Sequence, residues 1–193
     1  MNSIINIAIF ASGSGSNAQK IMDYFQGSYD IHVKYLLSNN KDAYALERAK
    51  EMGVETKIFN RKAFRESNDV VEFLRNNDVS WVVLAGFLWM IPENLIKAFP
   101  DRIINIHPAL LPLYGGKGMY GIHVHTAVHE AKDKESGISI HLVNEKYDEG
   151  EIVFQAKCLL DENDTPESIA QKVLRLEHEH FPKVIESLIK KSF

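Results

Sequence analysis

The sequence has very little cysteine, no excess of positive charge and no long apolar run. Its single cysteine, Cys158, excludes a disulfide within the 193-residue chain and is typical of a reducing compartment. The formal net charge of −4 argues against a nucleic-acid partner, because binding to a phosphate backbone normally uses a basic surface. No apolar run reaches the length of a membrane span, and no basic residue precedes the apolar segment IINIAIFA, so no signal peptide is expected. These absences favour a cytoplasmic protein that binds neither nucleic acid nor membrane.

The order of the apolar runs predicts the fold. No linker rich in Pro, Gly or Ser divides the chain, so we expect a single domain over residues 1–193. Apolar, β-branched runs alternate with helix-like segments, which is typical of a parallel sheet covered by helices on both faces. The pattern predicts strands at 4–10, 31–37, 54–59, 81–85 and 102–106, and helices at 17–26, 41–52, 68–77 and 93–99.

The pattern changes after residue 137. The runs GISIHLVN and GEIVFQAKCLL are joined by the polar stretch EKYDEG, which predicts an antiparallel hairpin. A long helix is expected from about 165 to 190, with Thr165 as its N-cap and Pro166 in its first turn. The sequence therefore predicts an α/β, doubly wound, mostly parallel sheet with a C-terminal hairpin and a long C-terminal helix.

In such sheets ligands bind at the carboxyl ends of the strands, which here are followed by the loops 11–17, 86–92 and 106–122. The first loop reads SGSGSN and leads into a helix, whose free N–H groups favour a phosphate. A full dinucleotide is not favoured, because the second strand is followed by no carboxylate before Asp42. A flexible strand-to-helix turn with no ligand is the alternative.

Asn105 and His107 stand two residues apart at the end of the last predicted parallel strand. Side chains alternate along a strand, so both point to the same side, and Pro108 ends the strand. An amide beside an imidazole is suited to an oxyanion site, and Asp148 in the hairpin turn is a candidate partner for the histidine. The alternative is a loop histidine bonded to backbone. No GxSxG pattern occurs, so we expect the substrate to supply any nucleophile.

Four motifs occur in a fixed order: SGSGSN, LAGF at 84–87, NIHPALLP at 105–112 and DEG at 148–150. Together they resemble the phosphoribosylglycinamide formyltransferases of the folate-dependent formyltransferase superfamily, over nearly the whole chain. The resemblance implies a Rossmann-like formyltransferase fold. It also implies transfer of the formyl group of 10-formyltetrahydrofolate, a co-substrate, to the amine of 5-phosphoribosylglycinamide (glycinamide ribonucleotide) in de novo purine biosynthesis.

The resemblance also implies residue roles. Asn105 would hydrogen-bond the formyl oxygen, His107 as imidazolium would stabilise the tetrahedral oxyanion, and Asp148 would keep His107 charged and oriented. Residues 1–100 would form a phosphate-binding half and residues 101–193 a catalytic and folate-binding half. No metal is expected, and the protein would be a monomer or a homodimer. The remaining residues would hold the phosphate (Gly15, Ser16, Asn17), the ribose (Glu177) and the formylfolate (Arg65, Leu88, Trp89, Met90, Ile91, with Asn105).

The sequence departs from the family pattern at three places. Ala109 stands where serine is frequent, Trp89 stands where arginine is frequent, and the stretch 114–125 is longer than in many relatives. The change at Trp89 puts side-chain contacts to the folate in doubt, and the longer stretch is expected to reshape the substrate entrance.

Three alternative functions remain open. A histidine metal site is suggested by His123, His125 and His129, although no HExxH pattern accompanies them. The methionyl-tRNA formyltransferases and formyltetrahydrofolate hydrolases share the Asn-His-Asp set but carry an extra domain, for which we expect no room here. A non-catalytic nucleotide-binding module would explain SGSGSN but not the other three residues.

Overall fold

The computed structural model describes residues 4–192 and divides the chain into two compact units. The first unit extends to Ile104 and the second begins at Asn105. The boundary falls inside strand β5 (Ile103–His107), so this one strand contributes to both units.

The first unit is built on parallel strands in the order β3-β2-β1-β4, with the start of β5 next to β4. The strands are β1 (Ile5–Phe10), β2 (Ile31–Ser38), β3 (Glu55–Ile58) and β4 (Val79–Leu84). The last four residues of β1 and of β4 are all buried, as expected for strands covered on both faces. Each predicted strand is confirmed within two residues.

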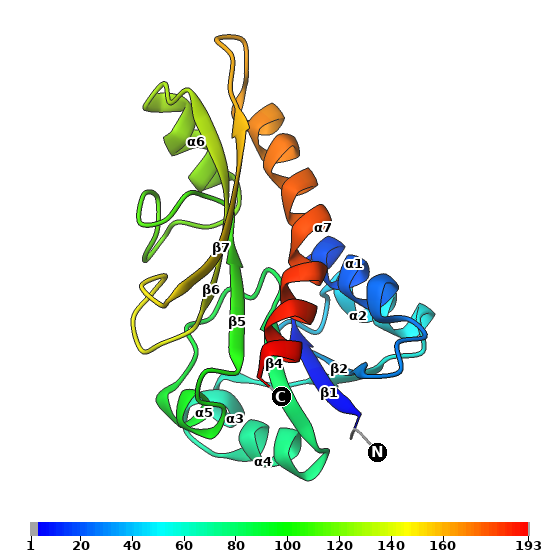
Figure 1. Cartoon of the computed structure of the whole chain (residues 1–193). Helices are drawn as coiled ribbons and strands as arrows, with labels where there is room; N and C mark the ends of the chain where they lie inside the picture. Colours follow the sequence, from blue (N-terminus) through cyan, green and yellow to red (C-terminus); the bar gives the residue numbers. More distant parts are fainter. Residues whose placement is uncertain (1–3, 193) are drawn as a thin grey trace. The chain divides into compact units, whose positions relative to one another are not determined.

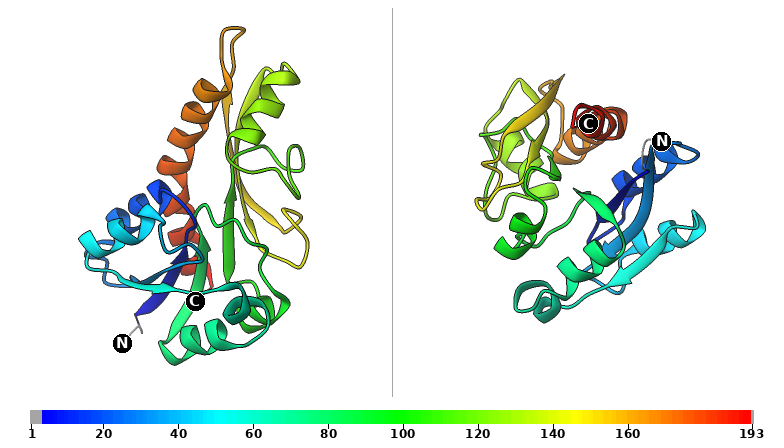
Figure 2. Two further views of the ribbon diagram at one scale, coloured as in Figure 1. Left: turned by 180° about the vertical axis from the view of Figure 1, so that it is seen from behind. Right: turned by 60° about the horizontal axis from the view of Figure 1, so that its bottom comes forward.

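Helices cover both faces of this sheet. Figures 1 and 2 show α1 (Ser16–Phe25) and α2 (Tyr44–Glu51) side by side on one face, and α3 (Arg61–Arg65) and α4 (Asp69–Asn76) on the other. Helix α5 (Glu93–Ala98) packs against α4. The four predicted helices are confirmed. Helix α3 was not predicted, because five residues are too few to show a helical period.

The second unit contains the end of β5, the strands β6 (Glu135–Leu142) and β7 (Ile152–Leu159), and the helices α6 (Ile122–Glu130) and α7 (Pro166–Lys191). Strands β6 and β7 pair antiparallel, which confirms the predicted hairpin. Helix α7 packs against α6, β6 and β7 (Figure 1). The Thr165 side chain accepts a hydrogen bond from Ser168 N, so the predicted N-cap is confirmed. The α/β architecture agrees with the predicted fold class.

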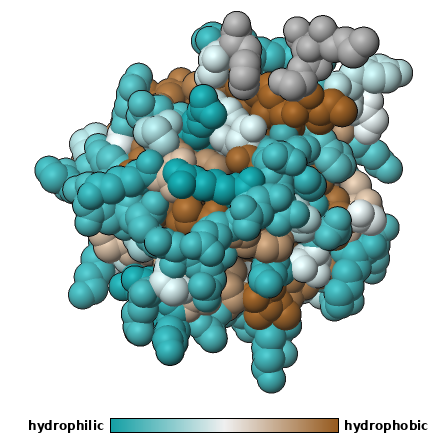
Figure 3. All heavy atoms as spheres, turned by 90° about the horizontal axis from the view of Figure 1, so that it is seen from below, coloured by the Kyte–Doolittle hydropathy of each residue, from teal (hydrophilic) through white to brown (hydrophobic). Residues whose placement is uncertain are grey.

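The face drawn in Figure 3 is mostly polar. On the face drawn in Figure 3, hydrophilic side chains cover most of the surface and hydrophobic ones form separate patches. Within residues 4–192, no helix is long and apolar enough to cross a membrane.

Candidate active site

Strand β5 brings Asn105 and His107 to one group of polar side chains in the second unit. The Asn105 amide nitrogen donates a hydrogen bond of 3.0 Å to His141 Nε2. His107 Nδ1 lies 3.6 Å from Asp148 Oδ2, and His141 Nε2 lies 3.6 Å from the other carboxylate oxygen. Both β5 side chains therefore point into this group, Asn105 toward His141 and His107 toward Asp148, as the alternation along the strand predicts.

Asp148 reaches this group from the loop that joins β6 to β7. Its backbone has a positive φ of 53°, and its carboxylate accepts a hydrogen bond of 2.9 Å from Gly116 N. Two residues later, a Cβ atom at Gly150 would lie 1.7 Å from the Leu142 carbonyl oxygen, so only glycine lets the loop return this closely. The structure thus brings Asn105, His107 and Asp148 together.

The ring orientation of His107 is fixed by a backbone contact. Its Nε2 lies 2.7 Å from the Tyr114 carbonyl oxygen, which can only accept, so Nε2 carries the proton and Nδ1 faces Asp148. The alternative interpretation, a histidine bonded to backbone, therefore applies to one of the two ring nitrogens only. The other nitrogen is left for chemistry beside the carboxylate.

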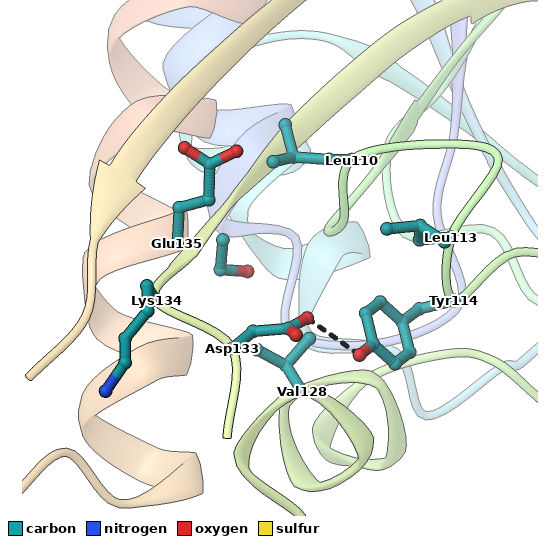
Figure 4. Close-up of a pocket in the computed structure, with 8 residues that line it drawn as sticks. Leu110, Leu113, Tyr114, Val128, Asp133, Lys134 and Glu135 are labelled. Carbon is teal, nitrogen blue, oxygen red and sulfur yellow. Dashed lines mark hydrogen bonds between the residues drawn. The ribbon is translucent and has the colours of Figure 1, made fainter. Parts of the chain in front are cut away.

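Tyr114 is itself held in place, as Figure 4 shows. Its hydroxyl donates a hydrogen bond of 2.7 Å to Asp133, and burial together with this carboxylate raises the pKa of Tyr114 to about 12. The two residues line a cavity of about 180 Å³ that contains none of the predicted site residues. Tyr114 and Gly116 belong to the long 114–125 stretch, which therefore contributes two backbone contacts to the site.

Burial and charge have opposite effects on the two ionisable groups. Burial, with a smaller effect of His141, lowers the pKa of His107 below its ordinary value, although Asp148 and the Tyr114 carbonyl act to raise it. Burial would raise the pKa of Asp148, but His141, His107 and the Gly116 N–H hold it below its usual range. The structure therefore favours a neutral imidazole beside an ionised carboxylate. The expectation that Asp148 keeps His107 charged and oriented stays a prediction.

One buried histidine of this group, His141, was not singled out from the sequence. His141 is 2% exposed, and its Nδ1 donates to the Leu142 carbonyl oxygen, so in its neutral form Nε2 accepts from Asn105. His141 follows Ser139 by two residues on β6, so the two side chains point to the same side of the strand. This alternation was the signal available in the sequence. His125 on α6 is 6% exposed, and burial followed by the charge of His107 lowers its pKa.

The histidine metal site is not favoured by the geometry. His125 is buried, whereas His123 and His129 on the same helix are exposed. In the part of the chain that the structure describes, no group of three or more His, Cys, Asp or Glu side chains is arranged to hold a metal ion.

In the first unit, the SGSGSN loop ends at the N-terminus of α1. Gly15 is the N-cap with a φ of 72°, and Ser16 and Asn17 form the first turn of the helix instead of the loop. A Cβ atom at Gly15 would lie 2.5 Å from Ala45 Cβ, so the close approach of α2 requires glycine. The first N–H groups of a helix have no partner within it and point toward its N-terminal end, where an anion can accept from them.

The predicted folate residues of the first unit lie on α3 and between β4 and α5. Arg65 is an exposed residue at the end of α3, Leu88 is exposed and Ile91 is buried. Trp89 packs against Phe64 with ring centroids 5.9 Å apart, and the Arg61 guanidinium lies 5.7 Å from the Trp89 ring centre. The residue that departs from the family pattern is thus part of an aromatic cluster.

The predicted ribose ligand lies on the long helix of the second unit. Glu177 is on α7 and is 8% exposed, in a helix whose other buried residues are apolar. A carboxylate is rarely so buried unless it has polar partners, so its position is consistent with a binding role.

Comparison with known proteins identifies the family. The chain matches the family model described as formyl transferase over residues 5–185. It is 45% identical over 189 residues to the chloroplastic phosphoribosylglycinamide formyltransferase of Arabidopsis thaliana, covering 94% of this chain but only 64% of that relative, which is less than two thirds of its length.

Two bacterial proteins match over nearly their whole length. The phosphoribosylglycinamide formyltransferase of Bacillus subtilis is 34% identical over 189 residues, which cover 94% of this chain and 93% of that protein. The crystal structure of phosphoribosylglycinamide formyltransferase from Bacillus halodurans is similar with a TM-score of 0.87 at 32% identity, and covers 97% of each chain. The chain therefore belongs to the formyl transferase family, and within it to the phosphoribosylglycinamide formyltransferases.

Proposed function

We propose that the chain transfers the formyl group of 10-formyltetrahydrofolate to the amine of 5-phosphoribosylglycinamide in de novo purine biosynthesis. The observation that carries this proposal is the convergence of Asn105, His107 and Asp148 on one point of the second unit. An amide donor, an imidazole and a carboxylate are suited to an acyl transfer in which the substrate supplies the nucleophile.

The reaction begins when the substrate amine attacks the formyl carbon and the formyl oxygen becomes an oxyanion. An amide has two N–H donors, so Asn105 can donate one to His141 and the other to this oxyanion. His107 Nδ1 accepts the proton that the attacking nitrogen loses. The imidazolium formed beside Asp148 stabilises the oxyanion, and then returns the proton to N10 of tetrahydrofolate as the C–N bond breaks.

A neutral resting histidine suits this sequence of steps. Burial lowers the pKa of His107, so its Nδ1 is free to accept a proton when the amine attacks. The ionised Asp148 then favours the charged imidazole that has formed, because an opposite charge nearby stabilises it. The role of Asp148 is to stabilise this transient charge.

The two substrates are assigned to residues by the same proposal. The backbone N–H groups of Gly15, Ser16 and Asn17 hold the 5′-phosphate at the start of α1, and Glu177 accepts hydrogen bonds from the ribose. Arg65 and the segment 88–91 of the first unit are assigned to donor binding, and Asn105 to the formyl oxygen. On this assignment the first unit binds the phosphate and the second carries the catalytic residues.

We also propose a cytoplasmic location and a monomer or homodimer that acts on small molecules, with no metal and no nucleic-acid partner. The single cysteine and the net charge of −4 support this. The name of the Arabidopsis relative includes a chloroplastic location, so fractionation of the source cells is the test of compartment.

The function is tested by offering 10-formyltetrahydrofolate with three competing acceptors: 5-phosphoribosylglycinamide, water and methionyl-tRNA. We expect formyl transfer to the glycinamide ribonucleotide with release of tetrahydrofolate in equal amount. Release without a formylated product would indicate a hydrolase, and formylated methionyl-tRNA would indicate the other branch of the superfamily.

A further inference from the structure

The Ser12 hydroxyl lies between two segments of the first unit. It donates a hydrogen bond of 2.7 Å to Asn39 Oδ1 and accepts one of 3.0 Å from the Leu88 backbone N–H. Ser12 is 7% exposed, so these bonds are largely shielded from water. Because the hydroxyl has one hydrogen, the acceptor at Asn39 orients it so that a lone pair faces Leu88.

The Ser12 backbone joins the same segments. Its N–H donates to the Gly86 carbonyl oxygen at 3.1 Å, and its own carbonyl oxygen accepts from the Asn40 side chain at 3.3 Å. Ser12 thus connects three strand ends: the loop after β1, the turn after β2 and the segment after β4.

The segment after β4 is anchored unevenly. The neighbours of Leu88 are fixed by ring packing, since Phe87 lies 5.4 Å from Phe10 and Trp89 lies 6.1 Å from Phe59 between ring centroids. The Leu88 side chain is 55% exposed and contributes little packing. At Leu88 itself, the hydrogen bond from its backbone N–H to the Ser12 hydroxyl holds the chain between these two anchored residues.

We propose that Ser12 is a positioning residue for the formyl donor, although it lies in the loop that leads to the phosphate site. By holding the Leu88 N–H, it sets the backbone of the segment 88–91, which the proposed function assigns to the donor. The proposal rests on the proposed function of that segment. Ser12 would then also fix the position of the SGSGSN loop relative to the segment 88–91 within the first unit.

The test is whether Ser12→Ala changes the KM for 10-formyltetrahydrofolate but not the KM for 5-phosphoribosylglycinamide. Loss of one hydrogen bond to the donor segment is expected to raise the KM for 10-formyltetrahydrofolate about three- to tenfold. The KM for 5-phosphoribosylglycinamide and kcat should change less than about twofold. Ser12→Thr keeps the hydroxyl and should restore the donor KM.

Two further variants control for loss of stability. Ser38 is fully buried, and its hydroxyl donates to the Asn40 carbonyl oxygen within its own turn, so Ser38→Ala should lower the melting temperature and leave the donor KM unchanged. Asn39→Ala keeps the Ser12 hydroxyl but removes the acceptor that orients it. Asn39→Ala should raise the donor KM by a smaller factor than Ser12→Ala. The double variant should show no effect beyond that of Ser12→Ala alone. If Ser12→Ala does not fold, Asn39→Ala serves as the test.

Binding of tetrahydrofolate, the released form of the donor, is measured by titration in the same variants. A donor-specific loss in Ser12→Ala supports the proposal. An equal rise in both KM values, an unchanged donor KM, or the same donor effect in Ser38→Ala overturns it. A wild-type chain that binds tetrahydrofolate but transfers no formyl group refutes the proposed function, while the binding data still decide the role of Ser12.

Discussion

The pKa of His107 is shifted in opposite directions by burial and by a nearby carboxylate, and the sequence alone does not show which effect is larger. The side chain is 4% exposed, and burial lowers its pKa more strongly than the nearby Asp148 raises it. The result is an imidazole that is neutral until a reaction delivers a proton. A buried histidine that only bridged backbone groups would need no carboxylate 3.6 Å from its second nitrogen.

The first prediction concerns this side chain. His107→Ala should lower kcat for formyl transfer by about 10²- to 10⁴-fold, the usual contribution of a positioned acid or base. Binding of 5-phosphoribosylglycinamide, measured by calorimetry, should be retained, because the predicted phosphate ligands lie on α1. His123→Ala, at an exposed position of α6, is the control. Binding lost in proportion to rate would identify a structural histidine instead.

The second prediction concerns Asp148. Replacement by asparagine removes the carboxylate that raises the pKa of His107, so this pKa should fall further. We expect kcat to fall more than either KM rises, and the kcat limb that reports His107 to move to lower pH. Glu149→Gln changes an exposed neighbour of the same charge and should leave the profile as it is. An identical pH–rate profile in Asp148→Asn would contradict the role assigned to this carboxylate.

Helices and strands differ in how well the sequence predicts them. Strands β1 and β4 are long apolar runs and α7 begins with a Thr-Pro cap, so local patterns were sufficient. Helix α3 (Arg61–Arg65) was missed because five residues show no helical period. Its N-cap Asn60, whose side chain accepts a hydrogen bond of 2.9 Å from Ala63 N, was not recognised as a start signal. Such short elements depend on capping and on their tertiary surroundings more than on periodicity.

The third prediction belongs to the junction of β1 and α1. Gly15→Ala should destabilise the fold by about 1–3 kcal/mol, because the new Cβ would overlap Ala45 and the residue has a φ of 72°. It should also weaken binding of the phosphorylated substrate, since α1 must shift. Gly13→Ala is a matched control, because a Cβ there meets nothing within 4 Å. Urea unfolding and calorimetry with 5-phosphoribosylglycinamide measure the two effects, and equal losses in both variants would refute the argument.

At the scale of the whole chain, the limits of sequence reasoning are set by long-range contacts. The pairing of His107 with Asp148 was expected only from the family resemblance, since the two residues are distant in the sequence and on different elements. The bond between Asn105 and His141 was not expected, because nothing local links residues 36 positions apart. The same holds for the Ser12 hydroxyl and Leu88, which are separated by 76 positions. The positions of the strands follow from local patterns, but contacts between loops follow from packing.

The last prediction concerns stability and pH. Burial lowers the pKa values of His107 and His125 in the folded chain from 6.5, so the unfolded chain binds more protons as the pH falls below that value. The free energy of unfolding should therefore have its highest value above about pH 6.5 and decrease progressively toward pH 5. The lowered pKa of Asp148 has its effect only below its ordinary value of 3.8, outside this window. His125→Gln removes one of the two groups and should flatten the decrease measured by urea unfolding. His129→Gln, at an exposed position of the same helix, should not. A decrease of the same size in all three chains would show that these buried histidines do not cause it.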